Sequence, residues 1–146
     1  DPNSAWLLRR SMQTFHIRMK AQSETTKIIR DWLSKHEAVK KVYYPQIDGK
    51  QLTDYATLLF FDLRDDLIDR YPQFIEALRW FDTGTGMACV TSMVARPYFG
   101  SHASMSDSDK ETMGLTAQLV RLSIGLEDTN DLMEDLNNAF KKIMSL

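Results

Sequence analysis

Apolar residues recur with a helical period at both ends of the chain. The N-terminal pattern predicts a long helix from about Ala5 to His36, with a kink near His16. Its first part carries a loose stripe, expected to face the core, that consists of Trp6, Leu7, Arg10, Phe15 and Met19. A last helix is predicted after Asp128, and its sharper stripe consists of Leu132, Met133, Leu136, Ala139, Phe140 and Ile143.

Between these helices the pattern changes to that of strands. Residues 39–44 are rich in β-branched and aromatic side chains and precede Pro45, which suits a strand at a sheet edge. Residues 56–63 are nearly all apolar, as expected of a buried central strand. Residues 120–124 alternate between apolar and polar, and small and β-branched residues predict a further strand within 81–97.

Two shorter helices complete the predicted order. Pro72 suits the first turn of a helix that ends near Trp80. Ser106 suits the N-cap of a one- to two-turn helix that Gly114 stops. The order is α-β-β-α-β-α-β-α, with one or two strands between the second and third helices. It predicts an α+β fold, with helices covering a mixed or antiparallel sheet, in a single domain over residues 1–146.

Composition excludes several classes of function. Apolar residues make up 43% of the 146 residues, which is enough to form a core. The net charge of −2 argues against a nucleic acid or an anionic membrane as the main partner, and no apolar run is long enough to span a bilayer. Cys89 is the single cysteine, which excludes an internal disulfide framework and a Cys-rich metal site. A lone thiol fits a reducing compartment, and the expected location is cytoplasmic.

Three short motifs are weak signals for chemistry. The Gly84–Gly86 segment lacks the strand-to-helix context of a phosphate-binding loop, so close backbone approach is the preferred interpretation. Ser101 and His102 would point to opposite faces of an extended segment, so no nucleophile–base pair is expected. No metal-ligand spacing is found among the three histidines, His16, His36 and His102.

Arg121 is the sharpest candidate for a functional residue. In its predicted strand it shares a face with Leu119 and Ser123, while the opposite face is wholly apolar. A guanidinium group in a half-buried strand is costly unless it is paired. One interpretation is a structural salt bridge to Glu127 or Asp128, or simple exposure to solvent. The other is that the arginine fork binds a carboxylate through two hydrogen bonds.

Four segments, in order along nearly the whole chain, resemble segments of one enzyme family. Residues 5–19 (AWLLRRSMQTFHIRM) resemble its AWLLLRGLKTLPLRM stretch, and residues 41–45 match its KVYYP. Residues 101–105 (SHASM) match the region that follows a proline-marked turn in the same family. Residues 119–131 (LVRLSIGLEDTND) are similar to the family's LVRLSVGIEDVED. The family is that of the Cys/Met-metabolism, or trans-sulfuration, enzymes, which use pyridoxal phosphate.

The resemblance implies that this chain is the small C-terminal domain of a fold-type-I pyridoxal-phosphate enzyme. The family's large domain would lie upstream in the same polypeptide and would bind pyridoxal 5'-phosphate through a lysine in an S-x-T-K context. No lysine of this sequence lies in that context, and Lys27 is the nearest look-alike. The resemblance therefore implies no catalytic, cofactor-binding or metal-binding residue in this chain, which alone is expected to be inactive.

The resemblance also assigns substrate-binding residues. In the family, the arginine of the LVRLS motif binds the α-carboxylate of the amino-acid substrate, and this role falls on Arg121. The family's SLGGVES segment aligns with residues 86–92 (GMACVTS), so that Gly86 stands where the family has its first serine. Thr85 or backbone N–H groups are expected to substitute for the missing hydroxyl.

The implied function is that of an enzyme acting on sulfur amino acids or homoserine esters. The cystathionine γ-synthase or γ-lyase type is favoured, with assembly into a homo-oligomer, a tetramer in the family. Because residues 86–92 differ from the family's SLGGVES segment, a degenerate pseudo-enzyme is an alternative. A non-catalytic α+β assembly or binding module is a further alternative, and an upstream lysine in the S-x-T-K context would distinguish the enzyme from the module.

Overall fold

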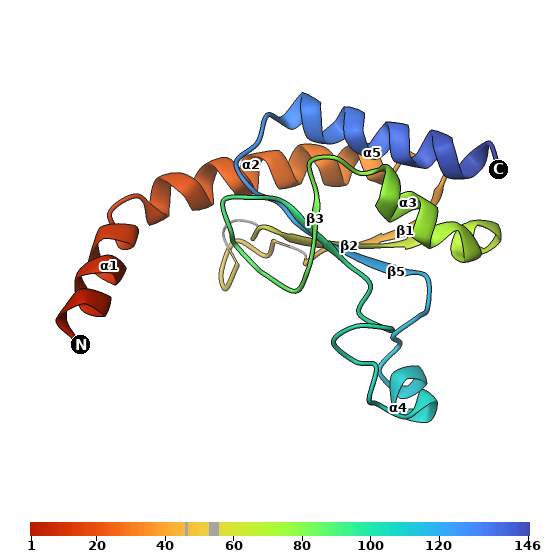
Figure 1. The fold of residues 1–146 in the computed structure, drawn as a ribbon, viewed down its shortest axis with the longest axis horizontal. Helices are drawn as coiled ribbons and strands as arrows, with labels where there is room; N and C mark the ends of the chain where they lie inside the picture. The colour runs from red at the N-terminus through yellow and green to blue at the C-terminus, as the bar shows by residue number, and fades with distance from the viewer. Residues whose placement is uncertain (46, 53–55) are drawn as a thin grey trace.

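The computed structural model describes residues 1–45, 47–52 and 56–146. These residues form a five-stranded sheet and a set of helices, most of which lie on one side of it (Figure 1). The strands are β1 (Val39–Tyr43), β2 (Leu58–Leu63), β3 (Asp82–Thr83), β4 (Met93–Ala95) and β5 (Leu119–Ser123). The helices are α1 (Pro2–Met12), α2 (Phe15–Leu33), α3 (Tyr71–Ala77), α4 (Asp107–Thr112) and α5 (Thr129–Met144), with a 3₁₀ helix, η1 (Asp65–Arg70), before α3.

The strands lie in the order β1-β2-β5-β4-β3. Neighbouring strands are antiparallel except β3 and β4, which run parallel. The sheet is therefore mixed, which confirms the predicted α+β class. The strand expected within 81–97 is two short strands joined by a loop. Ala88, with a positive φ of 54°, takes the backbone off the extended path between them.

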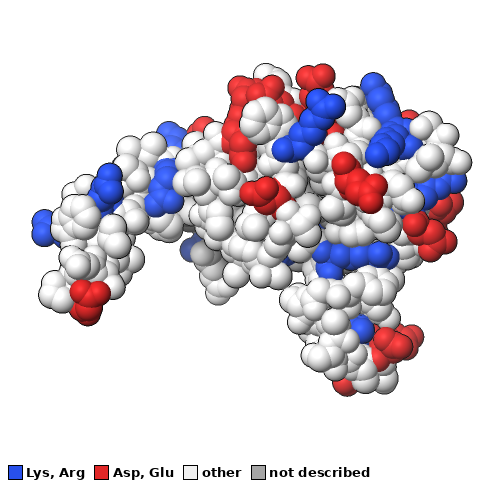
Figure 2. Space-filling model, viewed as in Figure 1, with Lys and Arg blue, Asp and Glu red and all other residues white. Residues whose placement is uncertain are grey.

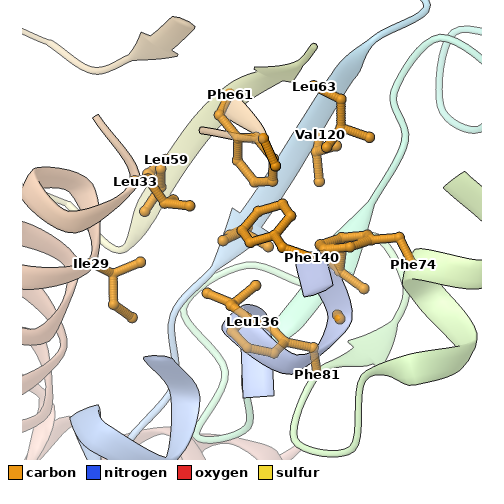
Figure 3. Close-up of a cluster of buried hydrophobic side chains, with 14 of the residues drawn as sticks. Ile29, Leu33, Leu59, Phe61, Leu63, Phe74, Phe81, Val120, Leu136 and Phe140 are labelled. Carbon is orange, nitrogen blue, oxygen red and sulfur yellow. The ribbon is translucent and has the colours of Figure 1, made fainter. Parts of the chain in front are cut away.

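The core lies between the sheet and its helices, because alternate residues of β2 and β5 point toward α5. The apolar face expected of β5 is confirmed, since Val120 and Leu122 are fully buried. Phe140 of α5 stacks on Phe74 of α3, with ring centroids 5.0 Å apart, and meets Phe61 of β2 edge-on at 5.9 Å (Figure 3). Burial of each such ring stabilises the fold by about 1.5–3 kcal/mol. Every residue of the predicted α5 stripe is buried except Met133, which packs against the core from its edge.

The predicted N-terminal helix is broken in two. A break at Gln13 and Thr14 separates α1 from α2, close to the kink expected near His16. The apolar stripe predicted for its first part does not face the core. No residue of α1 is buried, and Trp6 is 60% exposed. The reason is visible in Figure 1, where α1 projects beyond the end of the sheet, so that none of the described strands lies beneath it.

No helix among the described residues is both long and apolar enough to cross a membrane.

Candidate functional site

The sheet face opposite α2 and α5 carries the predicted substrate-binding arginine. Strand register places Tyr43, Phe60, Arg121 and Ala95 side by side in one row across β1, β2, β5 and β4. Directly paired residues of antiparallel strands project on the same face, so these four side chains share it. All four are half-buried. Because β5 is the central strand, Arg121 lies in the middle of the face.

The Arg121 guanidinium group is poorly satisfied by the protein. Its Nη2 donates to the carbonyl oxygen of Gly84 at 3.3 Å. Its Nε is shielded from solvent and has no hydrogen-bond partner in the described part of the chain. Leaving a buried donor unpaired costs about 1–3 kcal/mol. An anion with two acceptor oxygens would pair with this side of the guanidinium group.

Neither of the two carboxylates proposed from the sequence pairs with Arg121. Glu127 accepts hydrogen bonds from the backbone N–H of Ser92 (2.6 Å) and from its hydroxyl (2.8 Å). Asp128 is the N-cap of α5, where it accepts from the N–H of Asn130 at 2.8 Å. Over the described residues, no carboxylate forms an ion pair with Arg121. The salt-bridge interpretation is therefore wrong, because Ser92 engages Glu127 and Asp128 caps α5.

One carboxylate shares the open face with Arg121, and tyrosine and threonine engage it. Asp62 accepts from the hydroxyl of Tyr43 at 2.6 Å and from the hydroxyl of Thr116 at 2.8 Å. The hydrogen bond to Asp62 raises the pKa of Tyr43 to about 12. Tyr43 is therefore neutral at physiological pH, and Arg121 is the cationic member of its row.

The Gly84–Gly86 segment lies close to β4, as the sequence predicts. A Cβ atom at Gly84 would lie 2.6 Å from Cε of Met93, and one at Gly86 would overlap the Met93 Sδ. Gly86 does not have a left-handed φ, so a serine there would meet no backbone strain. It would instead lack space unless Met93 moved. Close packing, rather than phosphate binding, accounts for these glycines.

Among the described residues, neither Thr85 nor Gly86 is hydrogen-bonded to the guanidinium group, although the preceding Gly84 is. Thr85 is exposed and lines an apolar hollow of about 540 Å³ at the end of β3 and β4. In the same hollow, Arg96 is held between the rings of Tyr71 and Phe99, whose centroids lie 4.6 and 4.0 Å from its Cζ.

Two polar residues for which the sequence predicted no role bind the loop that follows Gly86. The N–H of Ala88 donates to the hydroxyl of Ser123 at 3.2 Å, and the side-chain amide of Gln22 donates to the carbonyl of Cys89 at 2.6 Å. Ser123 could have been found, because it alternates with Arg121 on the same strand face. Gln22 gave no such signal, since its contact spans 67 residues of sequence.

The sequence predicted that the side chains of Ser101 and His102 point to opposite faces of an extended segment, and this prediction is wrong. The Ser101 hydroxyl lies 2.9 Å from Nδ1 of His102, because the segment is a turn and not an extended strand. The pair is exposed to half-buried. No cluster of three or more potential metal ligands occurs in the residues that were described.

Comparisons with known proteins identify the family to which the chain belongs. The profile of the family described as Cys/Met metabolism PLP-dependent enzyme matches residues 1–141. The chain belongs to this family of pyridoxal-phosphate-dependent enzymes. It is 34% identical over 149 residues to cystathionine beta-lyase of Lactococcus lactis subsp. cremoris, covering 97% of this chain and 39% of that protein.

Solved structures show the same fold. Cystathionine gamma synthase of Xanthomonas oryzae pv. oryzae, in complex with cystathionine, has a TM-score of 0.89 at 27% identity and covers 99% of this chain. A putative O-acetylhomoserine (thiol)-lyase of Campylobacter jejuni, which carries N'-pyridoxyl-lysine-5'-monophosphate, has a TM-score of 0.85 at 25% identity and covers 96%. This chain spans 39% and 35% of those two chains. The described fold is thus that of a part of a fold-type-I pyridoxal-phosphate enzyme.

Proposed function

We propose that this chain is the substrate-orienting C-terminal domain of a pyridoxal-phosphate-dependent trans-sulfuration enzyme. Its substrate is a sulfur amino acid or a homoserine ester, with chemistry of the cystathionine γ-synthase or γ-lyase type. Arg121 binds the α-carboxylate of that substrate. The observation that carries the proposal is the shielded Nε of Arg121, which has no partner in the described structure while nearby carboxylates are engaged elsewhere.

The geometry of the site suits a carboxylate. Nε and Nη2 form one edge of the planar guanidinium group, and such an edge binds the two oxygens of a carboxylate side by side. The Gly84 carbonyl limits rotation of the group by accepting from Nη2. A fixed carboxylate fixes the direction of the substrate's Cα bonds. The contribution of this chain is therefore orientation, which in well-aligned reactions lowers barriers by several kcal/mol.

The residues around Arg121 fit a substrate carboxylate and not the cofactor. They include no lysine in hydrogen-bond contact with the site as far as the structure describes it. Lys110, which is buried, lies on α4, where its Nζ is 3.6 Å from Asp107 and 4.2 Å from the ring of Tyr98. When bound, pyridoxal phosphate supplies an electron sink for carbanion chemistry. We assign its binding to a large domain in the part of the family's length that this chain does not span.

The surface of α1 supports a role within a larger polypeptide. Trp6, Leu8 and Met12 are each at least 60% exposed, and Figure 2 shows the arm that α1 forms as mostly uncharged surface beside basic side chains. Exposed apolar surface of this kind marks a contact site. We assign it to contact with the large domain or with another subunit of a homo-oligomer. The same surface is what a non-catalytic assembly module would present, and that module is the alternative function.

Kinetics of the complete protein test the proposal. Replacing Arg121 by Ala removes a shielded, charge-assisted pair, so kcat/KM for the amino-acid substrate is expected to fall about 30- to 5,000-fold. Lys at this position should recover only part of the loss, because it offers a point charge in place of a fork. Arg79→Ala, at an exposed arginine near α5, is the matched control and should leave kcat/KM unchanged. Unchanged kcat/KM for Arg121→Ala, with only reduced thermal stability, would show that Arg121 is structural.

A further inference from the structure

Met93 lies beneath the loop that binds Arg121. In β4 it pairs with Ser123, and Ala95, two residues further on, pairs with Arg121. Residues two apart on a strand point to the same face, so Met93 and Arg121 share the open face. The Met93 side chain is half-buried there.

The thioether of Met93 occupies the space that two side chains of the loop would need. Cβ atoms at Gly84 and Gly86 would both fall on it, one at Cε and the other at Sδ. Both glycines have φ outside the left-handed region, so a side chain at either position would meet no backbone strain and would need only the Met93 thioether to move. The loop backbone therefore rests directly on Met93.

Gly84 is hydrogen-bonded to both β4 and β5. The N–H of Gly84 donates to the carbonyl of Val94 at 3.1 Å, while its own carbonyl accepts from Arg121. Further along, the N–H of Ala88 is bound to Ser123. Both ends of the loop are thus hydrogen-bonded to the sheet, and the Met93 side chain lies between the loop and the sheet.

We propose that Met93 is a positioning residue for Arg121, acting through Gly84 and coupled to the absence of a side chain at Gly86. This inference rests on the proposed function for the importance of Arg121 in substrate binding. Its packing component does not depend on that function. It predicts that a side chain at position 86 costs less stability when position 93 becomes smaller.

A thermal double-mutant cycle in the protein that carries this chain tests the packing. Gly86→Ala alone should lower the melting temperature by about 2–4 °C, because the half-buried Met93 thioether must move to admit the methyl group. Added to Met93→Ala, the same substitution should cost less, because the Met93 contacts are gone and the remaining close contact is the Cys89 Sγ at 3.1 Å. Additive effects of the two substitutions would overturn the proposal.

Two controls are built into the cycle. Met133→Ala, at a half-buried methionine of α5, should not relieve Gly86→Ala. Gly125→Ala should not be relieved by Met93→Ala, because a Cβ there would meet the backbone of Val90 and Ser92. If either control reduces the loss of melting temperature, the effect of a methionine substitution is not local, and this would count against a specific role for Met93.

A crystal structure and kinetics test the positioning. In Met93→Ala, the Gly84 carbonyl should move out of hydrogen-bond distance of Arg121, and KM for the amino-acid substrate should rise about 3- to 10-fold with a smaller change in kcat. Met93→Leu, which conserves volume, should restore both. An unchanged hydrogen bond at Gly84 would refute the positioning role even where the packing cycle succeeds. If the Gly84 hydrogen bond breaks as expected but kinetics respond neither to Met93→Ala nor to Arg121→Ala, the proposed function is refuted instead.

Discussion

Glu127 accepts two hydrogen bonds from Ser92, one from the backbone N–H at 2.6 Å and one from the hydroxyl at 2.8 Å. The same hydroxyl accepts from the N–H of Gly125 at 2.9 Å. This arrangement joins the start of β4 to the end of β5. It also directs the Glu127 carboxylate away from Arg121, and the guanidinium group is left available for a ligand.

Removal of the Ser92 hydroxyl should destabilise the domain. Ser92 is fully buried, so Ser92→Ala leaves the N–H of Gly125 and one oxygen of Glu127 without a partner. The expected loss is about 1–3 kcal/mol in the free energy of unfolding, measured by urea denaturation. Ser145→Ala, at the exposed end of α5, should change it by less than about 0.5 kcal/mol. Equal effects in the two variants would show that the Ser92 network contributes little.

Gly125 and Gly49 should respond to alanine for different reasons. A Cβ at Gly125 would lie 2.5 Å from the carbonyl oxygen of Val90, and backbone cannot rotate away as a side chain can. We expect Gly125→Ala to cost about 3 kcal/mol or more. Gly49 has open space but a φ of +71°, so Gly49→Ala should cost only about 1–2 kcal/mol. Thermal unfolding of both variants would test this order, and the reverse order would contradict it.

The stability of the domain should fall in mildly acidic solution because of His36. Burial lowers the pKa of this imidazole, which packs on Phe140 (4.5 Å) and Trp32 (4.9 Å) and accepts from the N–H of Ala38. Since the folded-state pKa lies below the unfolded value of about 6.5, the unfolded chain binds the proton more readily. Above the unfolded-state pKa, the imidazole is neutral in both states and burial of the ring contributes fully to stability. This contribution is lost as the pH falls through the folded-state pKa.

The check is the free energy of unfolding measured from about pH 7.5 to about pH 5 in the wild type and in His36→Asn. Asparagine retains an acceptor for the Ala38 N–H but does not titrate in this range. The decline toward acid should be shallower in His36→Asn. Identical slopes would rule out His36 as a source of the pH dependence.

Asp135 should matter more for stability than its exposed neighbours on α5. Its buried carboxylate accepts from the backbone N–H groups of Arg79 (3.0 and 2.9 Å) and Trp80 (2.9 Å), which follow the end of α3. Asp135→Ala would leave these donors unpaired and should cost about 1.5–3 kcal/mol in urea denaturation. Glu134→Ala, one residue away and exposed, is the control and should be nearly neutral. Similar losses in both variants would contradict this assignment.

The sequence predicted best those elements whose two faces differ most. The stripe of α5 and the apolar side of β5 follow from periodicity, because only one orientation buries Leu136, Phe140 and Val120. The half-buried position of Arg121 follows from the same alternation. The α+β class and the break near His16 were also within reach of local patterns.

Contacts between distant segments lay beyond local patterns. The apolar stripe that includes Trp6 indicates one face of a helix but not which element covers that face. In the structure α1 lies beyond the end of the described sheet, so the sheet does not cover it (Figure 1). The Glu127–Ser92 pair joins residues 35 apart, so the salt bridge considered for Arg121 could not be excluded beforehand. The packing of Met93 against Gly84 and Gly86 depends on a loop whose course one unexpected positive φ, at Ala88, helps to set.

The central position of β5 has a consequence for the order in which the fold can assemble. In the sheet, β5 lies between β2 and β4, yet it is the last strand along the chain. A nascent chain that has emerged only as far as residue 118 can pair β1 with β2 and β3 with β4, but these pairs share no strand. Arg121 arrives on the strand that joins them. The face that carries Arg121 therefore forms in the same late, long-range step that closes the sheet, and no earlier partial fold presents it.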